Sequence, residues 1–219
     1  MSQRLIDLSH ELDETTPVYP GDPCLQTRIL EVVGDERIQN RRALNSSSVE
    51  IGLHCGTHLD SPFHFYKEGR TIETVPLNQC VGPTFLLNLS PLPPNAQIDK
   101  CDLDRYEFSL RSVRKVILFT GWSQHWGKEN YFEEHPVLTG EAAKFLVNCG
   151  VHLVGVDFPS VDRPPFEAHL EFLGHNMVIL ENLTRLEQIP SEVFQLIAIP
   201  LKLRGREASP VRAIAMEVD

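Results

Sequence analysis

Three histidines and an aspartate lie close together in one short stretch of the chain. The segment reads His54-Cys-Gly-Thr-His58-Leu-Asp60-Ser-Pro-Phe-His64. Imidazole nitrogens and carboxylate oxygens are the ligands by which proteins bind divalent metals such as zinc and manganese. Chance clustering of this kind around a glycine and a proline is uncommon, so we expect His54, His58 and Asp60 to bind a metal ion.

The spacing of these residues requires the chain to bend between them. On a straight strand, which rises ~3.3 Å per residue, His54 and Asp60 would stand roughly 20 Å apart. Metal–ligand bonds are only about 2 Å long, so an extended segment could not join both residues to one ion. Gly56 tolerates unusual backbone angles and Pro62 ends strand pairing. We therefore expect a turn that brings His54 and His58 to one side, with Asp60 reaching the same ion or a second one.

Short apolar runs bounded by turn residues dominate the first half of the chain. Such runs are typical of strands. We predict strands at residues 28–33, 49–53 and 84–89, followed by a short helix at residues 99–106.

The second half of the chain alternates between strand and helix. A helix predicted at residues 138–148 carries apolar side chains at helical spacing, and Thr139 is placed to cap it. Strands predicted at residues 113–119 and 151–156 flank this helix, which is a β-α-β pattern. There is no internal repeat and no linker long enough to divide the chain. We therefore expect one mixed α/β domain over residues 1–219.

The composition excludes several classes of protein. Thirty acidic residues against 20 basic ones give a net charge of −10. Nucleic-acid-binding proteins carry a clustered basic surface, whereas no basic run here is longer than the pair Arg41-Arg42, so we expect no nucleic-acid partner. No apolar stretch approaches the ~20 residues of a membrane span, and the chain does not begin with a signal-peptide pattern. We expect no membrane partner and a cytoplasmic protein, whose five cysteines form no C-x-x-C pair.

Residues 54–64 form the string H-x-G-T-H-x-D-x-P-x-H, which resembles the signature of the cyclase-like metal hydrolases. That family includes bacterial kynurenine formamidases and isatin hydrolases. The resemblance implies the family's swivelling β/β/α fold, and a homodimer or larger homo-oligomer with partner loops near the pocket. Weaker matches follow the family's order along nearly the whole chain, at Asp7-Leu-Ser9, Pro17-Val-Tyr-Pro-Gly-Asp22, Thr120-Gly-Trp122, Gly155-Val-Asp-Phe-Pro-Ser160 and Ser209-Pro-Val-Arg212.

The resemblance also implies a set of metal ligands. His54, His58 and Asp60 match the first of them. The family's remaining ligands are a histidine and a glutamate twelve residues apart, which His169 and Glu181 match. In the formamidases Asp60 and Glu181 would contact two zinc ions, whereas the isatin hydrolases use one manganese. One or two Zn²⁺ ions are therefore the expected cofactor, with Mn²⁺ as the alternative.

Two further positions follow from the resemblance. His64 matches the family's catalytic histidine. Tyr19 aligns with an aromatic residue that contacts substrate and that is tryptophan in kynurenine formamidase. This difference bears on the identity of the substrate rather than on the metal site.

Spacing by itself does not decide which residues in the second half of the chain bind the metal. His175 lies near His169 and could serve as the ligand in its place. Glu167 and Glu171 are expected to be solvated acids in a loop. Asp157, at the end of an apolar strand, is expected to fix the tautomer of a ligand histidine through a hydrogen bond.

The expected chemistry is hydrolysis of a small amide. A metal ion with open coordination lowers the pKa of bound water from about 15.7 to about 7 and polarises the carbonyl under attack. The departing nitrogen also needs a proton, which His64 can supply. We therefore expect an arylformamidase-like enzyme that directs metal-bound hydroxide at the amide of N-formylkynurenine, giving kynurenine and formate. The alternatives are a ring-opening hydrolase of a cyclic amide, of the isatin type, and a non-catalytic metal-binding protein.

Overall fold

A mixed sheet of nine strands carries the fold. The computed structural model describes residues 4–31 and 44–217. The strands of the sheet are β1 (Leu5–Asp7), β4 (His58–Asp60), β5 (Val81–Asn88), β7 (Lys115–Phe119), β9 (Leu153–Val156), β10 (Val178–Glu181), β11 (Val193–Ile197), β12 (Ala208–Pro210) and β13 (Ile214–Met216). They lie in the order β1-β13-β11-β5-β7-β9-β10-β4-β12. The four central strands β5, β7, β9 and β10 pair in parallel, and the strands outside them pair antiparallel.

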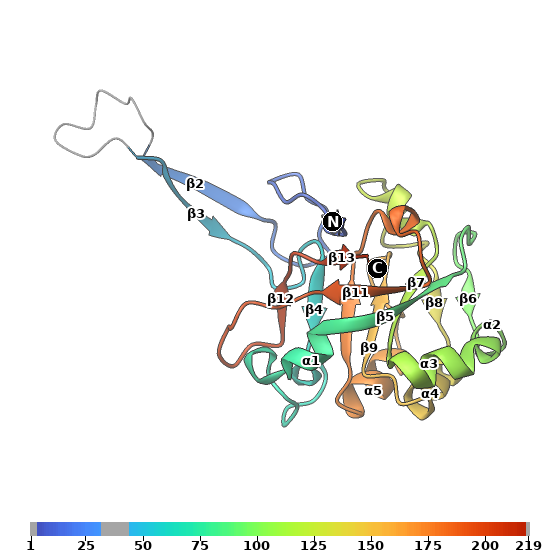
Figure 1. Cartoon of the computed structure of the whole chain (residues 1–219). Coiled ribbons are helices and arrows are strands. Elements are labelled where there is room, and N and C mark those ends of the chain that lie inside the picture. The colour runs from blue at the N-terminus through green and yellow to red at the C-terminus, as the bar shows by residue number, and fades with distance from the viewer. Residues whose placement is uncertain (1–3, 32–43, 218–219) are drawn as a thin grey trace.

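Four helices cover one face of this sheet: α2 (Lys100–Leu103), α3 (Glu107–Val113), α4 (Gly140–Asn148) and α5 (Glu167–Gly174). The short helix α1 (Leu77–Cys80) precedes β5, and its Cys80 packs against the other face. Figure 1 shows α3, α4 and α5 grouped on one side of the sheet. No described helix has the length and apolar character needed to cross a membrane.

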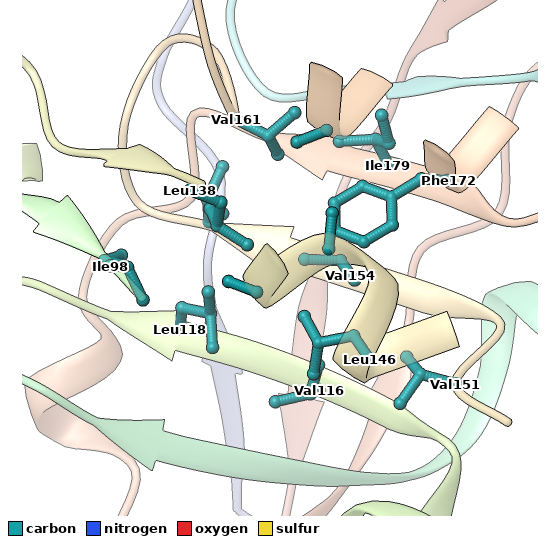
Figure 2. Packing of buried hydrophobic residues seen from close by; sticks show 14 of the residues in the cluster. Ile98, Val116, Leu118, Leu138, Leu146, Val151, Val154, Val161, Phe172 and Ile179 are labelled. Carbon is teal, nitrogen blue, oxygen red and sulfur yellow. The ribbon is translucent and has the colours of Figure 1, made fainter. Parts of the chain in front are cut away.

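Residues of the central strands alternate between two buried clusters, because successive side chains of a strand point to opposite faces. On β7, Val116 and Leu118 belong to the cluster beneath the helices, whereas Ile117 belongs to the cluster on the other face. Figure 2 shows the first cluster, in which Phe172 of α5 packs beside Val154 of β9. Burial on both faces explains why these strands are mostly apolar.

The predicted β-α-β unit is present. The Thr139 hydroxyl accepts a hydrogen bond from the Ala142 N–H (3.1 Å) and so caps α4, as its position predicted. This helix connects β7 to β9, which pair in parallel. The helix predicted at residues 99–106 is observed as α2 and a turn of 3₁₀ helix, and α3 continues the helical region beyond the prediction. A short parallel pair joins β6 (Gln97–Ile98) to β8 (Val137–Leu138).

A second pair of strands outside the main sheet forms an arm. β2 (Gln26–Glu31) and β3 (Ser46–Glu50) pair antiparallel and extend away from the body of the protein as an arm (Figure 1). They correspond to the strands predicted at residues 28–33 and 49–53, although residues 32 and 33 lie outside the described part of the chain. β3 ends earlier than predicted because the chain turns between Gly52 and β4, where the bend around the metal motif begins.

Candidate metal centre

β4 and β10 lie side by side and bring three predicted ligands together. The strands are antiparallel, with Glu181 opposite His58 and Ile179 opposite Asp60. Alternate residues of a strand share a face, so His58 and Asp60 point the same way, and Glu181 points with them from the neighbouring strand. Leu59 points to the apolar cluster on the opposite face. All three polar side chains are buried.

The ring of His58 is oriented by the backbone before β4. His58 Nδ1 donates a hydrogen bond to the Gly56 carbonyl (2.9 Å), which requires Nδ1 to carry the hydrogen. Nε2, on the other side of the ring, lies 3.3 Å from Glu181 Oε2 and 3.4 Å from Asp60 Oδ1. The predicted bend is present at Gly56, whose φ of +65° is a left-handed conformation that glycine adopts readily.

Three buried polar atoms in this group have no hydrogen-bond partner among the described residues. They are His58 Nε2 and both carboxylate oxygens of Asp60. A buried carboxylate is strongly unfavourable unless positive charge lies beside it, and a cation ligated by its oxygens supplies that charge. Two carboxylates and an imidazole are also a donor set that zinc and manganese accept. The residues present therefore fit a metal ion.

A second group of donor atoms adjoins the first. His54 lies in the turn before β4, and its Nδ1 is 2.9 Å from Asp60 Oδ1. His64 ends a short 3₁₀ helix after β4, and its ring centroid lies 4.3 Å from that of His54. One donor atom from each of His54, Asp60 and His64 lies within 4.8 Å of the others, as do donor atoms of His58, Asp60 and Glu181. Asp60 thus belongs to both groups.

The structure separates the two histidines that spacing could not distinguish. His169 is buried on α5, and its Nε2 lies 3.7 Å from Glu181 Oε1. Its ring stacks on that of Phe65 at 4.8 Å. His175 follows the last turn of α5, with its side chain 54% exposed and its Nδ1 hydrogen-bonded to the Glu171 carbonyl. Of the two, His169 is the one that reaches the cluster.

The expectation that Asp157 orients a ligand histidine is wrong. Its Oδ1 accepts hydrogen bonds from the N–H and hydroxyl of Thr120 (3.0 and 2.6 Å), and its Oδ2 accepts from the Gly121 N–H (2.8 Å). Burial raises the pKa of Asp157 to about 6, and these donors oppose the rise. Asp157 therefore anchors the turn after β7. An acid outside the proposed ligand set that does contact one of its histidines is Asp162, whose Oδ1 lies 2.6 Å from His169 Nδ1.

Glu167 and Glu171 lie on α5, and the loop expected around them is therefore wrong. The helix carries no recognisable cap in its own sequence, because Phe166 stands at the N-cap position and supplies no side-chain hydrogen bond. The missing acceptor comes from Asp162, in the preceding loop, which accepts hydrogen bonds from the first-turn N–H groups of Ala168 and His169. When the capping acceptor lies outside the N-cap position, the sequence shows no capping pattern that marks the start of the helix.

Asn182 is a second residue that the motifs did not identify. Its side-chain amide donates to the Gly56 carbonyl (2.9 Å), the same oxygen that accepts from His58, and its Oδ1 accepts from the Tyr131 hydroxyl (2.7 Å). The side chain thus holds the backbone that orients His58. Its position next to Glu181 was the one available signal.

Burial and neighbouring charges shift the pKa values of the side chains in this cluster. Burial opposes protonation of His58, but the Asp60 and Glu181 carboxylates outweigh it and raise the pKa of His58 well above its ordinary value. Burial favours the neutral form of Asp60, but His54 and His58 hold its pKa well below the usual range. Burial lowers the pKa of His64 to about 4, against the pull of Asp60. His64 is therefore in its neutral form at neutral pH, with a lone pair on one ring nitrogen.

The cluster opens into a cavity of about 240 Å³. Its aromatic walls include Tyr19, which meets the ring of Phe132 edge-on at 5.8 Å. A small cavity with aromatic walls and a few convergent polar groups suits a small aromatic molecule. The lining residues are Pro17, Tyr19, Asp22, His54, His58, His64, Phe65, Phe132, Pro159, Ser160, Phe166, His169, Glu181 and Asn182.

A curled mixed sheet thus carries a cluster of imidazoles and carboxylates beside an aromatic cavity. This arrangement places the protein among the metal-dependent hydrolases. The profile of the Cyclase family matches residues 6–163. The chain therefore belongs to the Cyclase family, which confirms the resemblance of its metal motif.

Relatives and solved structures extend this similarity over the whole chain. The kynurenine formamidase of Bacillus anthracis is 33% identical over 97% of each chain, and that of Bacillus cereus (strain ATCC 10987 / NRS 248) is 35% identical over 95% of each. A solved structure titled as a potential metal-dependent hydrolase with cyclase activity has a TM-score of 0.80 and 26% identity, with both chains fully covered. Isatin hydrolase A from Labrenzia aggregata has a TM-score of 0.85 at 24% identity, covering 99% of this chain and 94% of its own. These structures share the expected fold.

Replacing Asp157 tests its assignment as a structural anchor. In Asp157→Ala, the buried N–H groups of Thr120 and Gly121 lose their acceptor, so we expect the free energy of unfolding in urea to fall by about 2–4 kcal/mol. Metal affinity of the folded variant should stay within about twofold of the wild type. Unchanged stability together with weakened metal binding would restore the original expectation for Asp157.

Proposed function

We propose that this protein is a metal-dependent amidohydrolase of the arylformamidase type, which hydrolyses N-formylkynurenine to kynurenine and formate. The observation that carries the proposal is the buried Asp60 carboxylate, which faces the imidazoles of His54 and His58, has no other polar partner among the described residues and lies beside a cavity with aromatic walls. The sequence identity of 33% and 35% to kynurenine formamidases, over nearly the whole chain, supports the choice of substrate.

In this proposal His54, His58, Asp60, His169 and Glu181 hold the metal. The two donor groups that share Asp60 could hold one ion or two. Zinc is the proposed ion and manganese the alternative, because imidazole nitrogens and carboxylate oxygens suit both. When bound, the ion supplies a Lewis acid that ionises water and polarises the carbonyl of the substrate.

His64 is placed to move the proton that amide hydrolysis requires. Its ring lines the cavity, 4.3 Å from the ring of His54 and 6.0 Å from that of His169. Because burial keeps the imidazole neutral, it can accept a proton from the attacking water. The imidazolium can then donate that proton to the nitrogen of the breaking amide bond, so that the amine leaves as a neutral molecule.

The aromatic walls are proposed to orient the substrate. Tyr19, Phe132 and Phe166 line the cavity together with the histidines. An aromatic ring of the substrate can pack face to edge against such walls, which stabilises one orientation and excludes water from the reacting carbonyl. Tyr19 is the proposed substrate-binding residue among them.

Ring opening of a cyclic amide is the second candidate. Two observations favour it: the fold similarity to isatin hydrolase A, and Tyr19 at the position where tryptophan is expected in a formamidase. The bond broken is the same kind in both cases, so the shape of the cavity must distinguish the substrates. A purely structural metal site is less well supported, since it has no use for a neutral imidazole such as His64 beside a cavity.

Hydrolysis of a small panel of substrates distinguishes these functions. The protein loaded with Zn²⁺ or with Mn²⁺ is assayed on N-formylkynurenine, isatin and a simple lactone. We expect formate release from N-formylkynurenine to be the fastest reaction. Faster ring opening of isatin would support the second candidate, and inactivity on every substrate despite stoichiometric metal would support a structural site.

His64→Ala tests the proton shuttle. We expect kcat on the best substrate to fall by about 10²–10⁴-fold, because the departing nitrogen loses its proton donor. Metal content, measured by mass spectrometry, should be unchanged. His175→Ala, which removes an exposed histidine, is the matched control and should retain wild-type kcat. A loss of no more than a few-fold in His64→Ala with full metal content would show that His64 is not the acid and base.

Metal affinity should rise with pH. In the metal-free protein Asp60 and Glu181 raise the pKa of His58, so His58 holds a proton above the pH at which an ordinary histidine loses it. Metal and proton compete for the same nitrogen, and binding must release the proton. Calorimetric titration with Zn²⁺ at about pH 6 and about pH 8 should show tighter binding at the higher pH, with heats that depend on the buffer. Equal affinity at both values would contradict His58 as a ligand.

We also propose that residues 1–219 form one domain and that two such chains assemble as a homodimer through the arm of β2 and β3. Ile29 and Val49 lie on the same face of the arm and are 72% and 58% exposed. A two-stranded ribbon is marginally stable by itself in water, so its apolar face calls for a covering surface. A second copy of the chain is the proposed cover.

Sedimentation velocity tests the assembly. The wild type should sediment as a dimer, and Ile29→Asp should shift it toward the monomer because a charge replaces apolar surface at the interface. Phe108→Asp is the control, since Phe108 is 86% exposed on α3 and outside the arm. A monomeric wild type, or a dimer that Ile29→Asp leaves intact, would contradict the proposal.

A further inference from the structure

One acidic side chain holds both the backbone and the ring of His169. Asp162 lies in the loop between β9 and α5 and is buried. Its Oδ2 accepts hydrogen bonds from the N–H groups of Ala168 (2.6 Å) and His169 (3.1 Å), and its Oδ1 lies 2.6 Å from His169 Nδ1. The carboxylate therefore caps α5 with one oxygen and contacts the imidazole with the other.

These contacts determine which nitrogen of His169 carries the hydrogen. The carboxylate of Asp162 accepts two backbone N–H groups, so it can only accept from the imidazole as well, and Nδ1 must be the donor. Nε2 is then the nitrogen with the free lone pair, and it is the one that faces Glu181 Oε1. The ring cannot easily turn over, because Phe65 stacks on it at 4.8 Å and Phe166 meets it edge-on at 5.9 Å.

We propose that Asp162 is a positioning residue that selects the Nδ1–H tautomer of His169 and thereby makes Nε2 available to the metal. The inference rests on the proposed function, in which His169 is a ligand. The loop after β9 then contributes to metal affinity, because the Asp162 carboxylate that caps α5 also sets the tautomer of His169 on the first turn of that helix.

Replacing this carboxylate by an amide separates the capping of α5 from the selection of the His169 tautomer. In Asp162→Asn, the single carbonyl oxygen can accept the Ala168 and His169 N–H groups and keep α5 capped. The amide nitrogen then faces His169 Nδ1 and can only donate to it, which moves the imidazole hydrogen to Nε2. The same change of carboxylate to amide produces the wrong histidine tautomer in serine-protease triads. An Nε2–H group cannot ligate a cation, so metal binding should weaken while the fold remains.

The experiment compares Zn²⁺ affinity, thermal stability and the histidine tautomer. In Asp162→Asn we expect Zn²⁺ to bind about 10- to 100-fold more weakly than in the wild type, with a melting temperature of the metal-free protein close to that of the metal-free wild type. Asp99→Asn is the matched control, since Asp99 caps α2 through a side-chain hydrogen bond in the same way but has no ligand histidine beside it. It should bind Zn²⁺ as the wild type does. Unchanged Zn²⁺ affinity in Asp162→Asn would overturn the proposal.

Nitrogen-15 spectra of the histidine side chains provide a second measurement, which does not depend on the folding of Asp162→Asn. In the zinc-loaded wild type, His169 should carry its hydrogen on Nδ1, with the signal assigned by its absence from His169→Gln. A hydrogen on Nε2 instead would overturn the proposal. Failure of the proposed function gives a different result: Zn²⁺ would bind and the tautomer would be as expected, but no substrate of the panel would be hydrolysed.

Discussion

A buried carboxylate that faces only imidazoles and a second carboxylate is the constraint on which the rest of this structure depends. Among the described residues, neither oxygen of Asp60 has a hydrogen-bond partner. Such a group is stable only beside positive charge, which protons on the neighbouring imidazoles can supply in the metal-free chain and a divalent ion can supply in the loaded one. The pairing of β4 with β10, the left-handed turn at Gly56 and the first turn of α5 each bring an imidazole or a second carboxylate toward this one charge.

The first half of the candidate site could be predicted because its geometry is local. His54 and Asp60 needed one bend, and the residue that permits it, Gly56, lies between them. The β-α-β unit was predictable for the same reason, since the apolar period of α4 and its Thr139 cap are neighbours in the sequence. The ends of strands were less well defined: β7 begins two residues after its predicted start because α3 continues through Val113.

The second half depends on contacts that sequence spacing does not encode. α5 has no cap of its own, since the acceptor for its first turn reaches it from Asp162 in the preceding loop. Without the start of this helix its phase is unknown, so His169 and His175 could not be told apart. Asp157 and Asp162 are both buried acids after the same strand, and residue type does not reveal that one turns toward Thr120 and the other toward His169.

The proposed ligands come from the first third and the last third of the chain, which has a consequence beyond chemistry. An ion held by His54 and His169 together would bind the folded chain, in which these distant segments meet, and not the unfolded chain, so it favours the native state by mass action. Proteases degrade unfolded chains more readily than folded ones. A cell short of that ion would therefore lose the protein itself to degradation as well as its catalytic activity. The supply of the metal would then set the amount of the protein.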